Sequence, residues 1–440
     1  MTAIVLAKQR RRSELALGLL VVLVTVGGYV LVALADGPEL PADLYLFLGS
    51  VFGVYLIAHL AVRRFARAAD ATLLPLAAAL NGIGFVMISR LDRDLARIQS
   101  VWVLVGIGAF VLTLMVVRDV RLLERYRYTF LLLGVGFLLL PLVPGIGRTL
   151  NGARLWASVG PINFQPGEIA KVLLVIFFAA YLAEKRELLA AGSVRVGRAF
   201  LPAARHLGPL LLAWGASILV MVMEKDLGSS LLFFGVFAAM LYMATGRLYY
   251  VLIALVLFIF GALLAHAMFD HVQVRVDTWL DPWEDPNDKG YQIVQSWFAF
   301  GTGGLAGTGL GLGNPDKIPN SATDFIFSAI GEEWGLVGTM AVIITFMLLV
   351  GSAYRVAIEA ARPFAKLFAA GLATIFAFQS FIILAGVTRV IPLTGITLPF
   401  VSYGGSSLVA NFVVLALLLR ISHDSAVAAS APSAAVGARR

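Results

Sequence analysis

The chain of 440 residues contains no cysteine and only five histidines. The absence of cysteine excludes disulfides, thiolate zinc sites, iron–sulfur clusters and cysteine nucleophiles. The histidines form neither an HExxH motif nor any other paired metal-ligand spacing. Any chemistry that this protein performs must therefore rely on Asp, Glu, Lys, Arg, Ser or Tyr side chains.

Charged residues are also scarce, since they make up 14% of the sequence against 60% hydrophobic residues. A soluble globular domain typically has about 25% charged and about 45–50% apolar residues. Apolar runs of about twenty residues recur along the whole chain, and each is long enough to cross a hydrocarbon core roughly 30 Å thick. We therefore predict an all-α polytopic membrane protein.

The hydropathy pattern predicts about twelve transmembrane helices. An even number places both termini on one side of the membrane, and the basic N-terminus around residues 8–12 predicts that this side is the cytoplasm. The net charge of +8 follows from this topology, so it does not indicate a nucleic-acid partner. The predicted spans cover residues 15–35, 44–62, 72–89, 99–117, 129–145, 166–183, 207–223, 227–245, 249–269, 324–353, 366–387 and 397–419.

One extracytoplasmic loop, residues 270–323, is far longer than the other connections. Its DPWEDP sequence, which contains Asp281 and Asp285, combines carboxylates with prolines whose fixed dihedral angles favour a rigid turn. Partial burial and neighbouring acids would raise the proton affinity of a carboxylate there, as a general base requires. A solvated acidic loop or a calcium site is the alternative interpretation.

The same loop continues with an aromatic segment and a run of glycines. The aromatic residues within 292–306 predict an interfacial helix whose rings lie at headgroup depth. Backbone amides of the glycines between 301 and 313 could bind phosphate, but no strand precedes them, and an outer loop meets no soluble nucleotide. We therefore interpret this run as a flexible hinge.

Charged side chains inside a membrane span are costly, so each one marks a candidate functional site. Glu168 and Lys171 lie three residues apart on one helix face, where they either line a cavity or form a structural ion pair. Cations near the headgroups suit pyrophosphate, while carboxylates supply bases or hold a divalent cation such as Mg²⁺ or Mn²⁺. The other charged candidates on the outer side are Arg154, Asp226, Arg275, Asp324, Glu332 and Glu333.

The last outer segment, residues 388–408, interrupts the apolar pattern with prolines and glycines. Irregular backbone at membrane depth must be buried in protein or line a water-filled cavity. Ser402 would give such a cavity a hydroxyl group, whereas small-residue packing between helices is the structural alternative. Residues 422–440 are rich in Ala and Ser and predict a disordered cytoplasmic tail.

Five motifs in a fixed order resemble the SEDS family (shape, elongation, division and sporulation), which includes RodA and FtsW. The resemblance covers about residues 72–421 and implies a core of ten transmembrane helices, preceded by two extra helices within residues 1–71. The motifs are FQPGEIAK at 164–171, EKDLGSSLL at 224–232, RVDTWLDPWEDPNDKGYQIVQS at 275–296, TDFIFSAIGEEWGLVG at 323–338 and PLTGITLPFVSYGGSSL at 392–408.

The resemblance implies a peptidoglycan glycosyltransferase that polymerises lipid II at the outer face of the bacterial plasma membrane. It implies an inverting transfer from a lipid-linked disaccharide, and a class B penicillin-binding protein as the cross-linking partner. The catalytic carboxylate of the family matches Asp285, and Asp281 is its closest competitor. The substrate-binding candidates are Arg275, Glu168, Lys171, Asp226, Asp324 and Glu332 from the family pattern, together with Arg154 and Ser402 from the outer-face pattern.

The sequence departs from the family pattern at Gly167, where Ser is usual, at EKDLG, where QPDLG is common, and at Arg389, where Asn-Ile-Gly is more typical. The VTRVIPLTG variant and the two added helices look most like actinobacterial RodA, which favours cell elongation over division or sporulation. A lipid II flippase or other lipid transporter and a non-catalytic scaffold are the rival functions. The motifs gather at the outer face rather than at the midplane, which favours external chemistry over transport.

Overall fold

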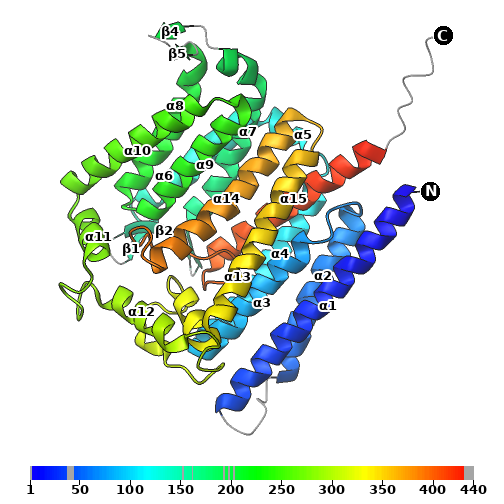
Figure 1. Cartoon of the computed structure of the whole chain (residues 1–440). Coiled ribbons are helices and arrows are strands. Elements are labelled where there is room, and N and C mark those ends of the chain that lie inside the picture. The colour runs from blue at the N-terminus through cyan, green and yellow to red at the C-terminus, as the bar shows by residue number, and fades with distance from the viewer. Residues whose placement is uncertain are drawn as a thin grey trace.

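The computed structural model describes residues 2–36, 44–150, 153–160, 162–191, 194–196, 199–201 and 204–430. This part of the chain is a bundle of long helices that run side by side (Figure 1). Within it, nine helices are long and apolar enough to cross a membrane. They are α1 (Thr2–Asp36), α3 (Leu73–Leu91), α4 (Arg93–Val116), α7 (Pro166–Ala191), α9 (Leu227–Thr245), α10 (Leu248–Met268), α13 (Ile326–Glu359), α14 (Pro363–Val387) and α15 (Gly405–Ser430).

Each predicted span overlaps a helix, because most of each long apolar run is free of proline and glycine clusters. Nine of them correspond to the helices just named. The other three correspond to α2 (Leu44–Phe65), α6 (Arg127–Leu139) and α8 (Ala204–Met223). The prediction of an all-α multi-pass membrane protein is thus confirmed. Shorter helical elements are α5 (Arg121–Arg125), α11 (Asp270–Leu280), α12 (Tyr291–Gly303) and the 3₁₀ turns η1 (Leu140–Leu142) and η2 (Pro315–Lys317).

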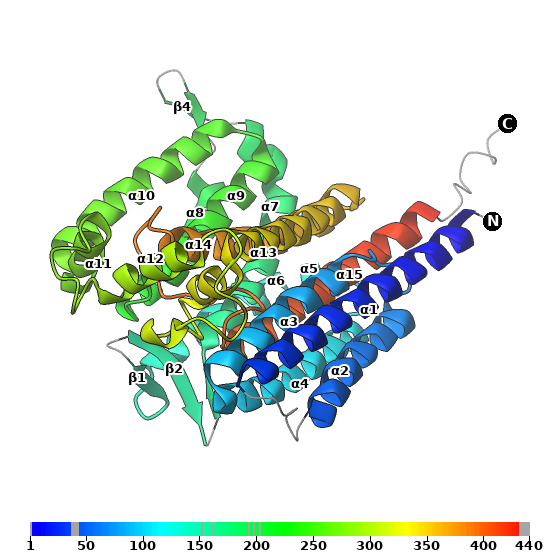
Figure 2. The same ribbon diagram turned by 60° about the horizontal axis from the view of Figure 1, so that its bottom comes forward.

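The two ends of the bundle carry different elements. The start of α1 and the end of α15 lie at one end in both views, whereas α11 and α12 lie at the other (Figure 1, Figure 2). We call the end with α11 and α12 the loop end. This arrangement agrees with termini on one side of a membrane and the long loop on the opposite side.

Two small antiparallel sheets occupy connections between helices. At the loop end, between α6 and α7, three strands pair in the order β1, β2, β3, with Ala157 opposite Phe164. The sequence did not indicate these strands, because each is short and neither sheet interrupts a span. The strands are β1 (Gly147–Leu150), β2 (Ala153–Val159) and β3 (Ile162–Phe164), with β4 (Val194–Val196) and β5 (Ala199–Leu201) between α7 and α8.

The centre of the bundle is formed by α7, α14 and α15, whose membrane-length segments are mostly buried. Phe177 from α7 and Phe368 and Phe376 from α14 are fully buried there. In contrast, α10 exposes almost its whole apolar surface, as a lipid-facing helix does. The charged side chains described below therefore reach the interior from helices that are otherwise apolar.

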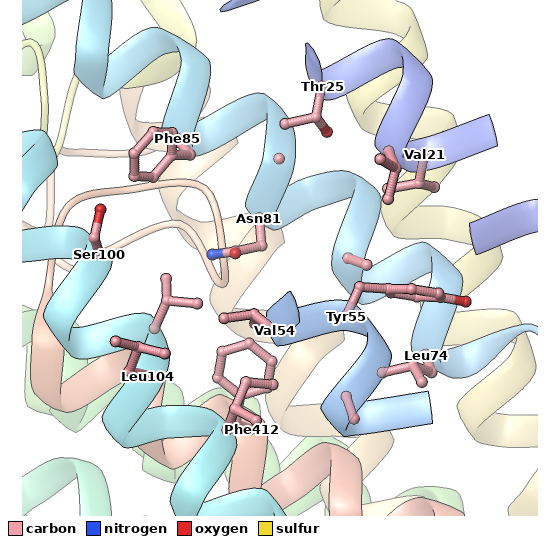
Figure 3. Close-up of a pocket in the computed structure, with 16 residues that line it drawn as sticks. Val21, Thr25, Val54, Tyr55, Leu74, Asn81, Phe85, Ser100, Leu104 and Phe412 are labelled. Carbon is pink, nitrogen blue, oxygen red and sulfur yellow. The ribbon is translucent and has the colours of Figure 1, made fainter. Parts of the chain in front are cut away.

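The two N-terminal helices pack against α3 and α4. A buried ion-pair cluster ties them together, because the carboxylate of Glu14 in α1 lies 2.7 Å from His59 Nδ1 and 3.1 Å from an Arg63 nitrogen, both in α2. Between this pair and the rest of the bundle lies an apolar cavity of about 90 Å³ (Figure 3). It is lined mainly by aliphatic side chains such as Val21 and Leu104, and it is separate from the site described below.

Two boundaries differ from the prediction. The last helix begins at Gly405 rather than near residue 397, because the prolines and glycines before it give the chain an irregular path. It continues to Ser430, so residues 422–430 are helical instead of belonging to a disordered tail. The rest of the predicted tail, 431–440, lies outside the described residues.

Candidate functional site

The irregular segment between α14 and α15, residues 388–404, lies at the loop end, and its part from 398 to 402 is buried in protein, as irregular backbone at membrane depth requires. The Ser402 hydroxyl holds it to the start of α13, since it donates to the Thr323 carbonyl at 2.6 Å and accepts from the Leu398 amide at 2.9 Å. On the opposite side, the Asn81 amide donates to the Phe400 carbonyl at 3.3 Å. Ser402, a predicted substrate-binding residue, thus shapes this segment.

Arg275 in α11 is anchored on the same segment. Its Nη1 donates to the carbonyls of Leu393 and Thr394 at 3.0 and 2.9 Å. The backbone of Gly395 has a φ of +78° and passes close to Arg275 and Asp324, so a β-carbon there would lie 3.7 Å from the guanidinium and 3.8 Å from the carboxylate. Two residues nearly fifty positions apart in the chain therefore meet at this turn.

Asp226 is the N-cap of α9 and accepts a hydrogen bond from the Ser229 amide at 2.9 Å. Its burial raises the pKa of the carboxyl group, and the charge of Glu168 raises it further, while Arg275 opposes the shift. Burial likewise raises the pKa of Asp324 to about 6, again against the charge of Arg275. Arg275 therefore lies in the field of two carboxylates from different parts of the chain.

Lys171 in α7 is buried, with 3% of its surface exposed. Its Nζ donates to the Glu168 carboxylate at 2.5 Å and to the side-chain oxygen of Gln379 at 2.9 Å. The Gln379 amide nitrogen in turn donates to the Thr397 carbonyl at 3.0 Å. This network joins the Glu168–Lys171 pair to the irregular segment, and sequence reasoning missed Gln379 because a lone Gln in an apolar span shows no pattern. We call Glu168, Lys171, Asp226, Arg275 and Asp324 the substrate cluster.

Polar atoms without partners lie beside the substrate cluster. Among the described residues, Glu224 Oε1 and Thr394 Oγ1 are buried and have no hydrogen-bond partner. Burial raises the pKa of Glu224 to about 8, and the nearby Asp226 raises it too. The unusual EKDLG sequence, with Glu224 at its start, was the one signal that could have identified this carboxyl group as part of the site.

The acidic turn between α11 and α12 holds its two aspartates differently. Asp281 accepts a hydrogen bond from the Trp283 amide at 3.0 Å, so its carboxylate is used within the turn. Asp285 is half-buried, and its carboxylate has no hydrogen-bond or ion-pair partner among the described residues. Its carbonyl accepts from the Gly290 amide at 2.9 Å, where a β-carbon would lie 2.0 Å from the Pro282 oxygen. The turn is therefore tight, and the Asp285 carboxylate remains available.

A second buried charge group, the loop cluster, lies at the start of α13. Arg90 donates to Glu333 Oε1 at 3.0 Å, and the Gly311 amide donates to Glu333 Oε2 at 2.9 Å. The Asn314 amide donates to Glu332 Oε1 at 2.8 Å. The loop cluster consists of Arg90, Glu332, Glu333 and these two amides.

The glycine run between 301 and 313 is not a flexible hinge, because its first residues, to Gly303, belong to α12 and the loop that follows is bonded to α13. The amides of Thr308 and Gly309 donate to the carbonyls of Glu332 and Glu333 at 2.9 and 3.1 Å. Gly307 fits against α13 at the kink formed by Gly335, where a β-carbon on Gly335 would lie 2.3 Å from the Gly307 nitrogen. The glycines are needed for close approach of two backbones.

The structure also bears on two further predictions, the role of Arg154 and the divalent cation. Arg154 lies in β2, and its amide donates to the Glu224 carbonyl at 3.1 Å, which ties the sheet to the connection that precedes α9. For the divalent cation, no three His, Asp or Glu side chains among the described residues come together as metal ligands. The described residues therefore do not fit a resident divalent cation.

Comparison with known families identifies the chain's relatives. The family model FTSW_RODA_SPOVE, described as cell cycle protein, matches residues 71–427. The peptidoglycan glycosyltransferase RodA of Mycobacterium tuberculosis is 46% identical over 427 residues, which cover 94% of this chain and 91% of that protein. The match therefore extends into the N-terminal helices, beyond the region that the family model describes.

Solved structures share the fold. A chain from a peptidoglycan synthase complex that coordinates polymerization and crosslinking has a TM-score of 0.66 and 28% identity, covering 81% of this chain and 98% of that one. The rod shape determining protein RodA of Thermus thermophilus has a TM-score of 0.57 and 28% identity, covering 81% of this chain and 97% of that one.

Proposed function

Because this chain belongs to the FtsW/RodA/SpoVE family and is a peptidoglycan glycosyltransferase of the SEDS family, we propose that it polymerises lipid II into β-1,4 glycan strands. The observation that carries this proposal is the substrate cluster at the loop end, where Arg275 donates to the irregular segment and Lys171 donates to Gln379, which itself binds that segment. Similarity to a RodA over 94% of the chain supports a role in cell elongation and shape.

We assign the general base to Asp285. In the proposed step, the 4-hydroxyl of an acceptor GlcNAc attacks the anomeric carbon of a donor MurNAc, and Asp285 takes the hydroxyl proton. The new oxygen–carbon bond forms as the bond from that carbon to the polyprenyl diphosphate breaks, so the configuration inverts. The unpartnered carboxylate of Asp285 supports this role over Asp281, whose carboxylate is bonded within the turn.

The leaving diphosphate needs positive charge as its bond breaks. Arg275 and Lys171 supply that charge in this proposal, and Asp226, Asp324 and Glu168 hold the two cations and bind sugar hydroxyls. Arg154, Ser402 and Glu332 contribute by holding the elements around the site, as their contacts with Glu224, Thr323 and Asn314 suggest.

We also propose how the protein lies in the plasma membrane. Twelve helices cross the plasma membrane, ten of them in the family core, with both termini in the cytoplasm and the loop end outside. The interfacial helix α12 then lies near the headgroups, and the lipid tails of donor and acceptor enter between helices. A class B penicillin-binding protein cross-links the product, which the similarity to a chain of a peptidoglycan synthase complex supports.

Purified protein with labelled lipid II tests the assignment of the base. We expect Asp285→Ala to abolish polymerisation while its melting temperature stays that of the wild type, since this carboxylate has no hydrogen-bond or ion-pair partner in the described part of the chain. Asp281→Ala is the matched control from the same turn and should retain most activity. Full polymerisation by Asp285→Ala would contradict the assignment of Asp285 as the general base.

Liposomes that contain lipid II separate the proposed function from its rivals. Polymer formation, with or without the cognate penicillin-binding protein, supports the glycosyltransferase. Movement of lipid II across the bilayer without polymer would support a flippase. Neither polymer nor movement under both conditions would support a scaffold.

A further inference from the structure

We propose that Arg389 is a positioning residue that holds the acidic turn carrying Asp285. The proposal rests on the proposed function only for the role of Asp285. The contacts of Arg389 themselves are independent of that role. Arg389 follows α14 directly, more than a hundred positions after the turn, at a site where the chain departs from its family's pattern.

The guanidinium of Arg389 binds the C-terminal end of α11. Its Nε donates to the Trp279 carbonyl, its Nη2 donates to the Leu280 carbonyl, and the Trp279 indole nitrogen donates back to the Arg389 carbonyl at 3.1 Å. The last carbonyls of a helix lack partners within the helix, and they carry its negative partial charge. A forked cation is therefore well suited to this position, which immediately precedes the acidic turn.

The same guanidinium also reaches the far side of the turn. It lies over the ring of Trp297 in α12, 4.9 Å from the ring centroid. The Trp297 ring in turn contacts Trp283, inside the turn, with centroids 6.3 Å apart, and Trp283 also meets Phe298 edge-on at 6.1 Å. Arg389 thus contacts both helices between which the turn is suspended.

The turn between these two anchors is short and internally bonded. Asp281 binds the Trp283 amide, and the Asp285 carbonyl binds the Gly290 amide. The tight approach of Gly290 to Pro282 leaves little room for the turn to change shape. A shift of α11 relative to α12 would therefore carry the Asp285 carboxylate with it, and Arg389 resists that shift.

The backbone conformation of Arg389 allows an experiment to test its side chain separately from its main chain. Its φ of +60° is unfavourable for any residue with a β-carbon and favourable for glycine. Arg389→Gly therefore relaxes the backbone while it removes the guanidinium. A loss caused by this variant reports on the side chain and not on a backbone that cannot form.

The first experiment measures lipid II polymerisation by the full-length protein. We expect Arg389→Gly to lower kcat about 100-fold with little change in KM, because misplacing a reacting group by about 1 Å can cost that much. Added methylguanidinium should restore part of kcat. Arg97→Gly is the control, since this exposed arginine pairs only with exposed Asp94 among the described residues, and it should behave as the wild type. An unchanged kcat in Arg389→Gly would overturn the proposal.

The second experiment needs no turnover. Hydrogen–deuterium exchange of residues 277–290 should be faster in Arg389→Gly than in the wild type and Arg97→Gly, while exchange in α14 and α15 stays the same. Equal exchange across the three proteins would overturn the positioning role. A wild-type protein that fails to polymerise lipid II would count against the proposed function, and the exchange data would still decide whether Arg389 holds the turn.

Discussion

Two groups of buried charge lie at the loop end, and they differ in how completely their polar atoms are bonded. In the loop cluster, both carboxylate oxygens of Glu333 have donors, and Glu332 accepts from a backbone amide. In the substrate cluster, Arg275 donates to two carbonyls but the carboxylate of Asp324 has no donor among the described residues. Glu224 and Thr394 beside it each bury an unpartnered oxygen.

The difference indicates two uses of buried charge. A buried carboxylate with a full set of donors stabilises the elements that supply them, and here it fixes the glycine loop on α13. Unpaired buried polar groups cost free energy, and a bound ligand can supply the hydrogen bonds that they lack. This difference supports our proposal that the substrate cluster binds a charged and hydroxyl-rich ligand.

The largest effect should come from breaking the loop cluster. Glu333→Ala leaves Arg90 Nε and the Gly311 amide without their acceptor, although Arg90 Nη2 still donates to the Gly313 carbonyl at 3.0 Å. Removing one partner of a buried pair costs about 3–5 kcal/mol of unfolding free energy. Thermal or denaturant unfolding of the purified protein measures this loss. Glu359→Ala, at an exposed position of the same helix, is the control and should unfold as the wild type. Equal stability of Glu333→Ala would remove the distinction between the clusters.

A change in the substrate cluster should act mainly on rate. Lys171→Met removes a cation from the site of the leaving diphosphate, and we expect polymerisation to fall about 10²- to 10³-fold, as when one preorganised donor is lost. Because Lys171→Met also leaves the largely buried Glu168 carboxylate without its cation, the rate is measured well below the melting temperature of the variant. Lys366→Met, an exposed lysine of α14, is the control. A rate loss that merely follows unfolding would mean that Lys171 is structural.

The smallest effect concerns pH. The folded protein raises the pKa of Glu224 to about 8, so the unfolded chain releases this proton at lower pH than the folded one. Wild-type stability should therefore be fully present below the ordinary Glu pKa and decrease as the pH rises to about 8. Glu224→Gln should make this decrease smaller, while Asp324, whose pKa is raised to about 6, still contributes its own part at lower pH. Melting temperatures of both proteins at pH 5, 6.5 and 8 measure the difference, and parallel curves would contradict the prediction.

Much of the fold could be predicted because it depends on local composition. The apolar runs located every helix that is long enough to cross a membrane, and the aromatic segment located α12. The prediction was poorer where the hydrogen-bond partners of a segment are backbone groups far away in the sequence. The glycines were read as a hinge because their contacts, the carbonyls of Glu332 and Glu333, come more than twenty residues later.

The candidate site was only partly predictable. The charged residues of the substrate cluster stood out because ionisable groups near a membrane span are costly. Gln379 did not, although its amide links Lys171 to the irregular segment, since a neutral polar residue in a span has no such signal. Arg389 was noticed as a departure, but its contacts with α11 and α12 could not be inferred from its neighbours in the chain.

By itself, the sequence determined that this protein lies in a membrane, where its helices are and which residue types its chemistry uses. These properties follow from hydropathy and composition, which act over a single helix or turn. Only the tertiary structure decided that Arg275 lies between Asp226 and Asp324, that Glu333 is bonded on both oxygens and that Arg389 spans the acidic turn. The reason is that electrostatic and hydrogen-bond energies depend on distances of a few ångströms, and helix packing sets those distances between residues far apart in the chain.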